Sequence, residues 1–158
     1  MFFWFIGTAI LAVGFVFRDP GFDYRLLVVG SVLPLADGVT GGVGPLHSVT
    51  VSTALLAIVM LSTRRGGSVR RLLLGLPIGM LMHLVFDGAW TDTDLFWWPF
   101  TGSSFADRGI PVVDRGWWSL LLELVGIGSC VWIARRNELT AAGRLRRFLR
   151  DGRLDIAV

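Results

Sequence analysis

Five runs of apolar residues, separated by short polar segments, set the pattern of this chain. They cover Phe2–Phe17, Leu26–Ala36, Leu46–Ser62, Leu72–Ala89 and Trp117–Ala134. Helices that cross the hydrocarbon core of a bilayer need about 20 apolar residues, with about 17 at the short end of the range. Leu26–Ala36 is too short to cross alone, contains Pro34 and leads into a glycine-rich segment, so we expect a short or broken helix there. The pattern predicts an all-α integral membrane bundle of about five apolar segments.

The composition of the 158-residue chain agrees with this pattern. Hydrophobic residues make up 53% of the chain, charged residues make up 17%, and the mean hydropathy is +0.64. Soluble domains are about 45–50% apolar and about a quarter charged. The first apolar run has no basic segment before it and no small-residue cleavage site, so we expect a membrane helix and not a signal peptide. We therefore expect a membrane helical domain over residues 1–134 and an Arg-rich tail over residues 135–158.

The basic residues are all arginine, and their positions predict the orientation of the chain. The long loop Asp87–Gly116 holds only Arg108 and Arg115. The remaining arginines lie in the other two loops and in the tail: Arg18, Arg25, Arg64, Arg65, Arg70, Arg71, Arg135, Arg136, Arg144, Arg146, Arg147, Arg150 and Arg153. Cytoplasmic segments of membrane proteins carry the excess of positive charge. The distribution predicts an N-out, C-in topology with a cytoplasmic tail and an external acidic loop.

The net charge of +3 and the pI of about 10.4 do not indicate nucleic-acid binding here. Arginine clusters at the ends of membrane segments are explained by topology and by contact with anionic lipid head groups, so membrane lipid is the expected partner. Five tryptophans mark the external ends of the last two runs and predict an aromatic belt at the outer interface: Trp90, Trp97, Trp98, Trp117 and Trp118. The absence of lysine indicates a GC-rich bacterial genome, so a bacterial inner or plasma membrane is the expected location.

Ionisable residues interrupt the apolar runs at one common depth. In the stretch "GMLMHLVFDGAW", His83 and Asp87 lie roughly 18 and 24 Å above Arg71 at about 1.5 Å per residue. The same rise places Asp37 at most about 18 Å from Arg25, His47 roughly 25 Å from Arg64 and Glu123 roughly 18 Å from Arg135. In a hydrocarbon core about 30 Å thick, all five fall in the outer half. Such groups are costly in a bilayer and mark functional sites or paired clusters.

Three interpretations of this layer stay open on the residues alone: a metal site, a proton or ion path, and a buried polar cluster that fixes helix packing. The spacing of His83 and Asp87 places both side chains on one helix face, where they can bind one ion together. Two imidazoles and two carboxylates suit a divalent metal, with zinc ahead of manganese or iron. A conduction path is disfavoured because the polar groups do not reach the Arg-rich side.

Three short blocks of the sequence resemble the YdjM family of membrane-bound metal-dependent hydrolases. The blocks are "GSVLPLADG", "GPLHS" and "GMLMHLVFDGAWTDTDLFWWP", and they cover about half of the chain, from Gly30 to Phe100. In that family they read approximately LPDxDH, HRGxTHS and a helix with HxxxD followed by a Thr-containing loop and Trp-Pro. The family is grouped with the all-helical phospholipase C and P1-nuclease-like zinc phosphoesterases. Leu35 replaces the first acid of the first block, Gly38 replaces its histidine, and Gly42 and Val43 replace the His-Arg of the second.

The resemblance implies one metal held by Asp37, His47, His83 and Asp87, and hydrolysis of a phosphoester or related bond. The outer-half depth of these groups, the glycine-rich break and the nearby tryptophans favour a lipid-type substrate that is reached from the external side of the membrane. The resemblance also implies Asp37 or Asp87 as a general base, with Glu123 as a further catalytic candidate that orients water or a histidine. The lost motif residues support an alternative hypothesis from another class. Under that alternative, the protein is a degenerate, non-catalytic membrane subunit or binding partner that retains a buried polar cluster.

Overall fold

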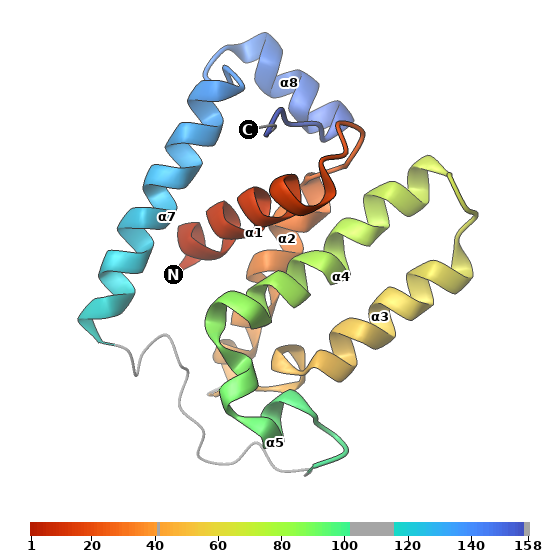
Figure 1. The fold of residues 1–158 in the computed structure, drawn as a ribbon, viewed down its shortest axis with the longest axis vertical. Helices are drawn as coiled ribbons and strands as arrows, with labels where there is room; N and C mark the ends of the chain where they lie inside the picture. Colours follow the sequence, from red (N-terminus) through yellow and green to blue (C-terminus); the bar gives the residue numbers. More distant parts are fainter. Residues whose placement is uncertain (41, 102–115, 157–158) are drawn as a thin grey trace.

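The computed structural model describes residues 1–40, 42–101 and 116–156, and all regular structure within these ranges is helical (Figure 1). In chain order, the α-helices and the 3-10 helices (η) are α1 (Phe2–Phe17), α2 (Arg25–Val32), η1 (Leu33–Thr40), η2 (Pro45–His47), α3 (Val49–Ser62), α4 (Ser68–Asp87), η3 (Ala89–Thr91), α5 (Thr93–Phe96), α7 (Trp117–Arg136) and α8 (Ala142–Asp151). The all-α prediction is therefore confirmed. Arg108 and Arg115 of the expected external loop lie outside the described residues.

The second apolar run forms a short helix that changes character beside Pro34. α2 covers only eight residues, and the chain continues from Leu33 as the 3-10 helix η1. Proline has no N–H to donate, and its ring clashes with the carbonyl of the preceding turn, so an α-helix ends or bends near it. The short or broken second segment is thus present, and it places Asp37 in η1.

Two helices, α4 and α7, are long and apolar enough to cross a membrane by length and composition. α1 and α3 are shorter apolar helices. α7 has few buried residues for so apolar a helix: within its 20 residues, Gly126 and Ile133 are buried, whereas Leu120, Leu124 and Val125 are exposed. Its apolar side chains therefore face outward over much of its surface.

Glycines let α2 and α4 cross at close range. Gly30 of α2 packs against the carbonyl of Leu76, and Gly79 of α4 packs against the α2 backbone at Leu27 and Ser31. A Cβ atom at Gly79 would lie 2.7 Å from the Ser31 nitrogen, a separation that real Cβ atoms essentially never show. Small residues at such positions are the common device for close helix packing in membranes. The α2 backbone thereby comes within reach of side chains one turn further along α4.

The end of the chain packs back onto the helices near the arginine-rich end of the bundle. Leu154 and Ile156 are buried with residues of α1, α2 and α7 in one hydrophobic cluster, and Ile156 packs against Gly14. The Tyr24 amide donates to the Gly152 carbonyl at 2.8 Å, which fixes the segment that follows α8. Figure 1 shows α8 and the segment that follows it near the last turn of α1. Leu154 and Ile156, which lie in the stretch expected as a tail beyond the membrane domain, thus contribute to the same core.

Candidate metal centre

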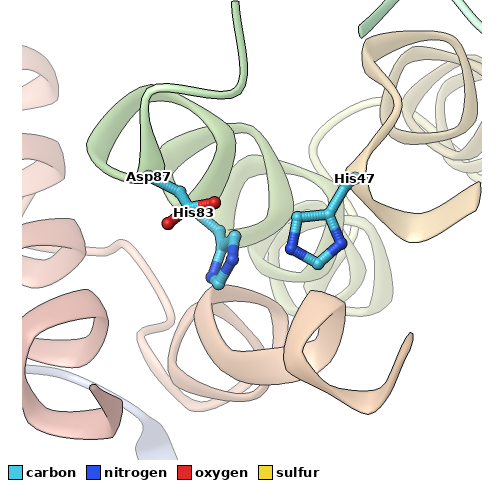
Figure 2. A group of neighbouring side chains, drawn as sticks. All are labelled: His47, His83 and Asp87. Atoms are coloured by element: carbon cyan, nitrogen blue, oxygen red, sulfur yellow. The ribbon is translucent and has the colours of Figure 1, made fainter. Parts of the chain in front are cut away.

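Three buried side chains with metal-binding chemistry converge where α4 ends. His47, His83 and Asp87 each offer one ligand atom, and these atoms all lie within 4.8 Å of one another. The three residues are 2%, 0% and 1% exposed. Figure 2 shows His83 and Asp87 projecting from the same helix while His47 approaches from a neighbouring segment. The structure therefore brings His47 next to His83 and Asp87, which follow it by 36 positions or more. The common depth estimated from the sequence predicted that these three residues lie together.

α4 positions two of these groups through its own periodicity. Residues four apart on a helix share a face, so the imidazole of His83 and the carboxylate of Asp87 lie one above the other. The helix ends directly after Asp87 at Gly88, whose φ of 70° is the left-handed conformation that glycine adopts without strain. The C-terminus of a helix carries partial negative charge. A buried carboxylate at this end makes the location favourable for a cation.

His47 is held from the opposite side by Asp37 and by a helix cap. Its Nδ1 lies 3.0 Å from Oδ2 of Asp37, and the same oxygen accepts the Gly44 amide at 3.1 Å. The next residue, Ser48, caps α3 by accepting the Thr50 amide and donates its hydroxyl to the Trp98 carbonyl at 2.8 Å. These contacts connect the His47 turn to the segment after α5.

The Asp37 carboxylate contacts the Nδ1 side of the His47 ring. A carboxylate oxygen accepts hydrogen bonds, so Nδ1 of His47 can donate to it, and in that tautomer Nε2 carries the lone pair. A carboxylate behind a histidine in this way orients metal-ligating imidazoles and increases their basicity. Asp37, which the sequence placed among the metal ligands, is not one of the three grouped side chains, and it contacts His47 instead.

The backbone carbonyl of Ser31 orients His83 in the same way as Asp37 orients His47. Nδ1 of His83 lies 2.7 Å from the Ser31 carbonyl oxygen, which can only accept, so the proton is on Nδ1 and the lone pair is on Nε2. The ring of Phe5 stacks on the His83 ring, with 3.9 Å between their centroids. Neither residue is apparent as a site residue from the sequence, because a backbone carbonyl and an aromatic side chain in apolar runs carry no distinguishing pattern.

The donor set could hold a metal ion. Two imidazole nitrogens and one carboxylate oxygen are zinc ligands with bond lengths of about 2.0–2.2 Å, which corresponds to ligand atoms about 3.3–3.6 Å apart in a tetrahedron. The limit of 4.8 Å between the ligand atoms is therefore within small side-chain rotations of that geometry. Three protein ligands leave a fourth position, the arrangement of catalytic zinc sites.

Glu123 belongs to α7, and its side chain lies at the start of α1. Its carboxylate oxygens accept the amides of Phe3 and Trp4, each at 3.2 Å, so it satisfies two of the first-turn N–H groups of that helix. Negative charge at a helix N-terminus is also stabilising. The indole N–H of Trp4 in turn donates to the Phe86 carbonyl at 3.4 Å, beside Asp87. Glu123 is thus connected to the centre through α1, and the structure does not group it with the three converging side chains.

Replacement of Glu123 distinguishes its capping of α1 from the catalytic role that the sequence suggested. Glu123→Ala is expected to lower the free energy of unfolding by about 1–2 kcal/mol, the usual cost of losing a cap, and to leave the metal content unchanged. Denaturant unfolding together with metal analysis measures both quantities. Leu124→Ala, at an exposed neighbouring position, is the control. Unchanged stability combined with lost hydrolysis would instead assign Glu123 to catalysis.

The chain matches no known protein family model, and no curated protein and no solved structure is detectably similar to it.

Proposed function

We propose that this protein is a membrane-embedded, metal-dependent hydrolase that acts on a phosphoester or lipid-type substrate from the external side of a bacterial membrane. The observation that carries the proposal is the convergence of His47, His83 and Asp87, with both imidazoles presenting Nε2. The similarity of the three sequence blocks to the YdjM family supports the same reaction class. Zinc is the proposed ion, ahead of manganese and iron.

The exposed apolar surface supports several crossings of the membrane. Large apolar side chains stand exposed along α1, α3 and α7, including Phe15, Leu61 and Leu120 at 65%, 88% and 64%. Water-soluble monomers rarely expose contiguous apolar patches beyond a few hundred Å². A bilayer accounts for this surface, and the arginines near the starts of α2 and α4 and the end of α7 then lie at its cytoplasmic face.

The chemistry follows from the donor set and its support. His47, His83 and Asp87 would hold a divalent metal, which would lower the pKa of a bound water and polarise the scissile phosphoryl or carbonyl oxygen. The hydrogen bonds from Nδ1 to Asp37 and to the Ser31 carbonyl hold both rings in the tautomer that binds metal. Asp87 supplies the negative charge of the set. Asp37, in contact with His47, holds that imidazole in place, and Asp37 or Asp87 is the proposed general base.

Aromatic residues at the same end of the bundle favour a lipid-type substrate. α5 and the residues after it lie close to η2, and they carry Trp97 and Phe100, which are 51% and 80% exposed. Tryptophan concentrates at the membrane–water interface, where one part of its ring is apolar and another is polar. A substrate with an acyl chain and a polar ester fits that position better than a fully soluble one.

Hydrolysis assays on the purified full-length protein test this proposal. Wild-type protein in detergent is expected to hydrolyse bis(p-nitrophenyl) phosphate or a short-chain phospholipid after loading with zinc. The activity should fall to background after chelation and in His83→Ala, and it should persist in Val85→Ala, an exposed position on the same helix. Metal-loaded protein that turns over neither probe would reject the hydrolase.

Burial of the centre favours a second candidate, a non-catalytic membrane protein in which the metal joins helices. All three side chains are at most 2% exposed, which suits a closed structural site as well as a reacting one. Structural metal sites contribute directly to folding free energy. This candidate predicts a metal-dependent rise in the unfolding temperature without turnover of either probe.

A further inference from the structure

A second site lies away from the metal centre, in a cavity at the arginine-rich end of the bundle. The cavity has a volume of about 470 Å³. Its walls come from the segment before α2, the first turn of α4 and the residues around the end of α8. Its charged lining consists of four arginines and two aspartates: Arg25, Arg71, Arg150, Arg153, Asp23 and Asp151.

Two of the four arginines are neutralised by the two aspartates. Arg25 makes a two-pronged contact with Asp23 at 3.0 and 2.6 Å and also donates to the carbonyls of Leu149 and Arg150. Arg150 binds Asp151 at 2.8 and 3.2 Å, and this contact lowers the pKa of the Asp151 carboxyl. Both aspartates are therefore already paired with an arginine.

Arg71 and Arg153 supply the uncompensated charge of the cavity. Neither side chain makes an ion pair with any residue in the described ranges, and both are exposed. A Cβ atom at Gly21 would lie 3.6 Å from Nη1 of Arg71 and 3.1 Å from Oδ1 of Asp19, so both side chains lie beside this glycine. The cavity thus carries an excess of two positive charges, from one residue on α4 and one on the returning C-terminal segment.

The start of α4 adds a further preference for an anion. Ser68 and Val69, the first two residues of this 20-residue helix, line the cavity. First-turn amides have no acceptor within their own helix, and the N-terminus carries partial positive charge. Guanidinium groups and helix N-termini are the usual ligands of phosphate oxygens.

We propose that this cavity binds a phosphate group, with Arg71 and Arg153 as its ligands. Phosphate is favoured over a carboxylate because its oxygens can engage both guanidiniums and the helix terminus together. The group can belong to an anionic phospholipid at the membrane surface or to a free phosphate. Basic pockets between membrane helices on the cytoplasmic side bind such head groups. This proposal does not depend on the metal centre or its chemistry.

A binding titration on the full-length protein in detergent tests the site. The shift in unfolding temperature is followed with dioctanoyl phosphatidic acid, dioctanoyl phosphatidylcholine and inorganic phosphate as separate probes. Arg71→Gln/Arg153→Gln is expected to weaken binding of the phosphate probe by roughly tenfold or more, given the strength of hydrogen bonds between charged groups. Arg146→Gln/Arg147→Gln, which removes the same charge from α8 outside the cavity, is expected to change it less than about twofold, because exposed charges contribute little individually.

The outcomes separate the two sources of phosphate. A shift with phosphatidic acid alone identifies a lipid head group, and an equal shift with inorganic phosphate identifies the free ion. Both support the cavity if they depend on Arg71 and Arg153. Equal loss in both double variants, or no shift with either anionic probe, would overturn it.

Photolabelling of the wild-type protein keeps the test independent of variant folding. A phosphatidic acid with a photoreactive group near its phosphate is expected to label peptides that contain residues 68–72 and 150–153. Labelling spread evenly over these peptides and over residues 64–65 and 144–147 would show diffuse charge attraction and reject a defined site.

Discussion

Purified wild-type protein is expected to carry close to one equivalent of a divalent transition metal, and His83→Ala/Asp87→Ala is expected to carry less than about a tenth of an equivalent. The double variant removes two of the three converging ligands, and a single remaining imidazole does not retain a divalent ion against competing water. Elemental analysis after expression in metal-replete medium gives the stoichiometry.

Graded variants distinguish a built site from adventitious binding. Asp37→Asn keeps the shape of the group behind His47 but removes its charge, so we expect metal affinity to fall by about 10- to 100-fold. Val85→Ala lies between the two α4 ligands on the exposed side of the helix and should bind like wild type. Equal metal content in wild type and His83→Ala/Asp87→Ala would contradict the centre, and with it the proposed hydrolase.

The second large effect is expected at the α2–α4 crossing. Gly79→Ala should lower the free energy of unfolding by about 3 kcal/mol or more, at the upper end of overpacking costs. The added methyl group meets the backbone of Leu27, Gly30 and Ser31, which cannot rotate away as a side chain would. Denaturant unfolding in detergent gives the difference from wild type.

Gly128→Ala provides a matched control for this substitution. Gly128 is also a helical glycine, but a Cβ atom there would meet nothing within 4 Å. Alanine is favoured over glycine in helix interiors by up to about 1 kcal/mol, so we expect unchanged or slightly increased stability. If Gly79→Ala were as well tolerated as Gly128→Ala, the close approach of α2 and α4 would be wrong.

Much of the centre could be predicted from the sequence because its geometry is partly local. The four-residue spacing of His83 and Asp87 determines a shared helix face, and counting along apolar runs brought His47 and Asp37 to the same depth. Local spacing does not determine the order of contacts across helices. The contact of Asp37 with His47, and that of the α7 residue Glu123 with the first turn of α1, depend on how separate segments meet.

In the fold, too, local features could be predicted from the sequence and contacts between distant segments could not. Pro34 marks the break after α2 because its effect on the backbone is local. The burial of Leu154 and Ile156 gave no comparable signal, since two apolar residues in a charged segment form no periodic pattern. Their place depends on the cluster that α1, α2 and α7 assemble for them.

The close contact of α2 and α4 at Gly30 and Gly79 also couples the packing of these helices to ion binding. Gly79 contacts Ser31, and the Ser31 carbonyl holds the His83 imidazole one helical turn further along, so one backbone segment serves both contacts. Linkage requires that an ion bound at His83 strengthen the α2–α4 association by the same factor by which that association strengthens ion binding. Metal depletion should therefore increase amide hydrogen exchange in α2, although none of the three metal ligands belongs to that helix.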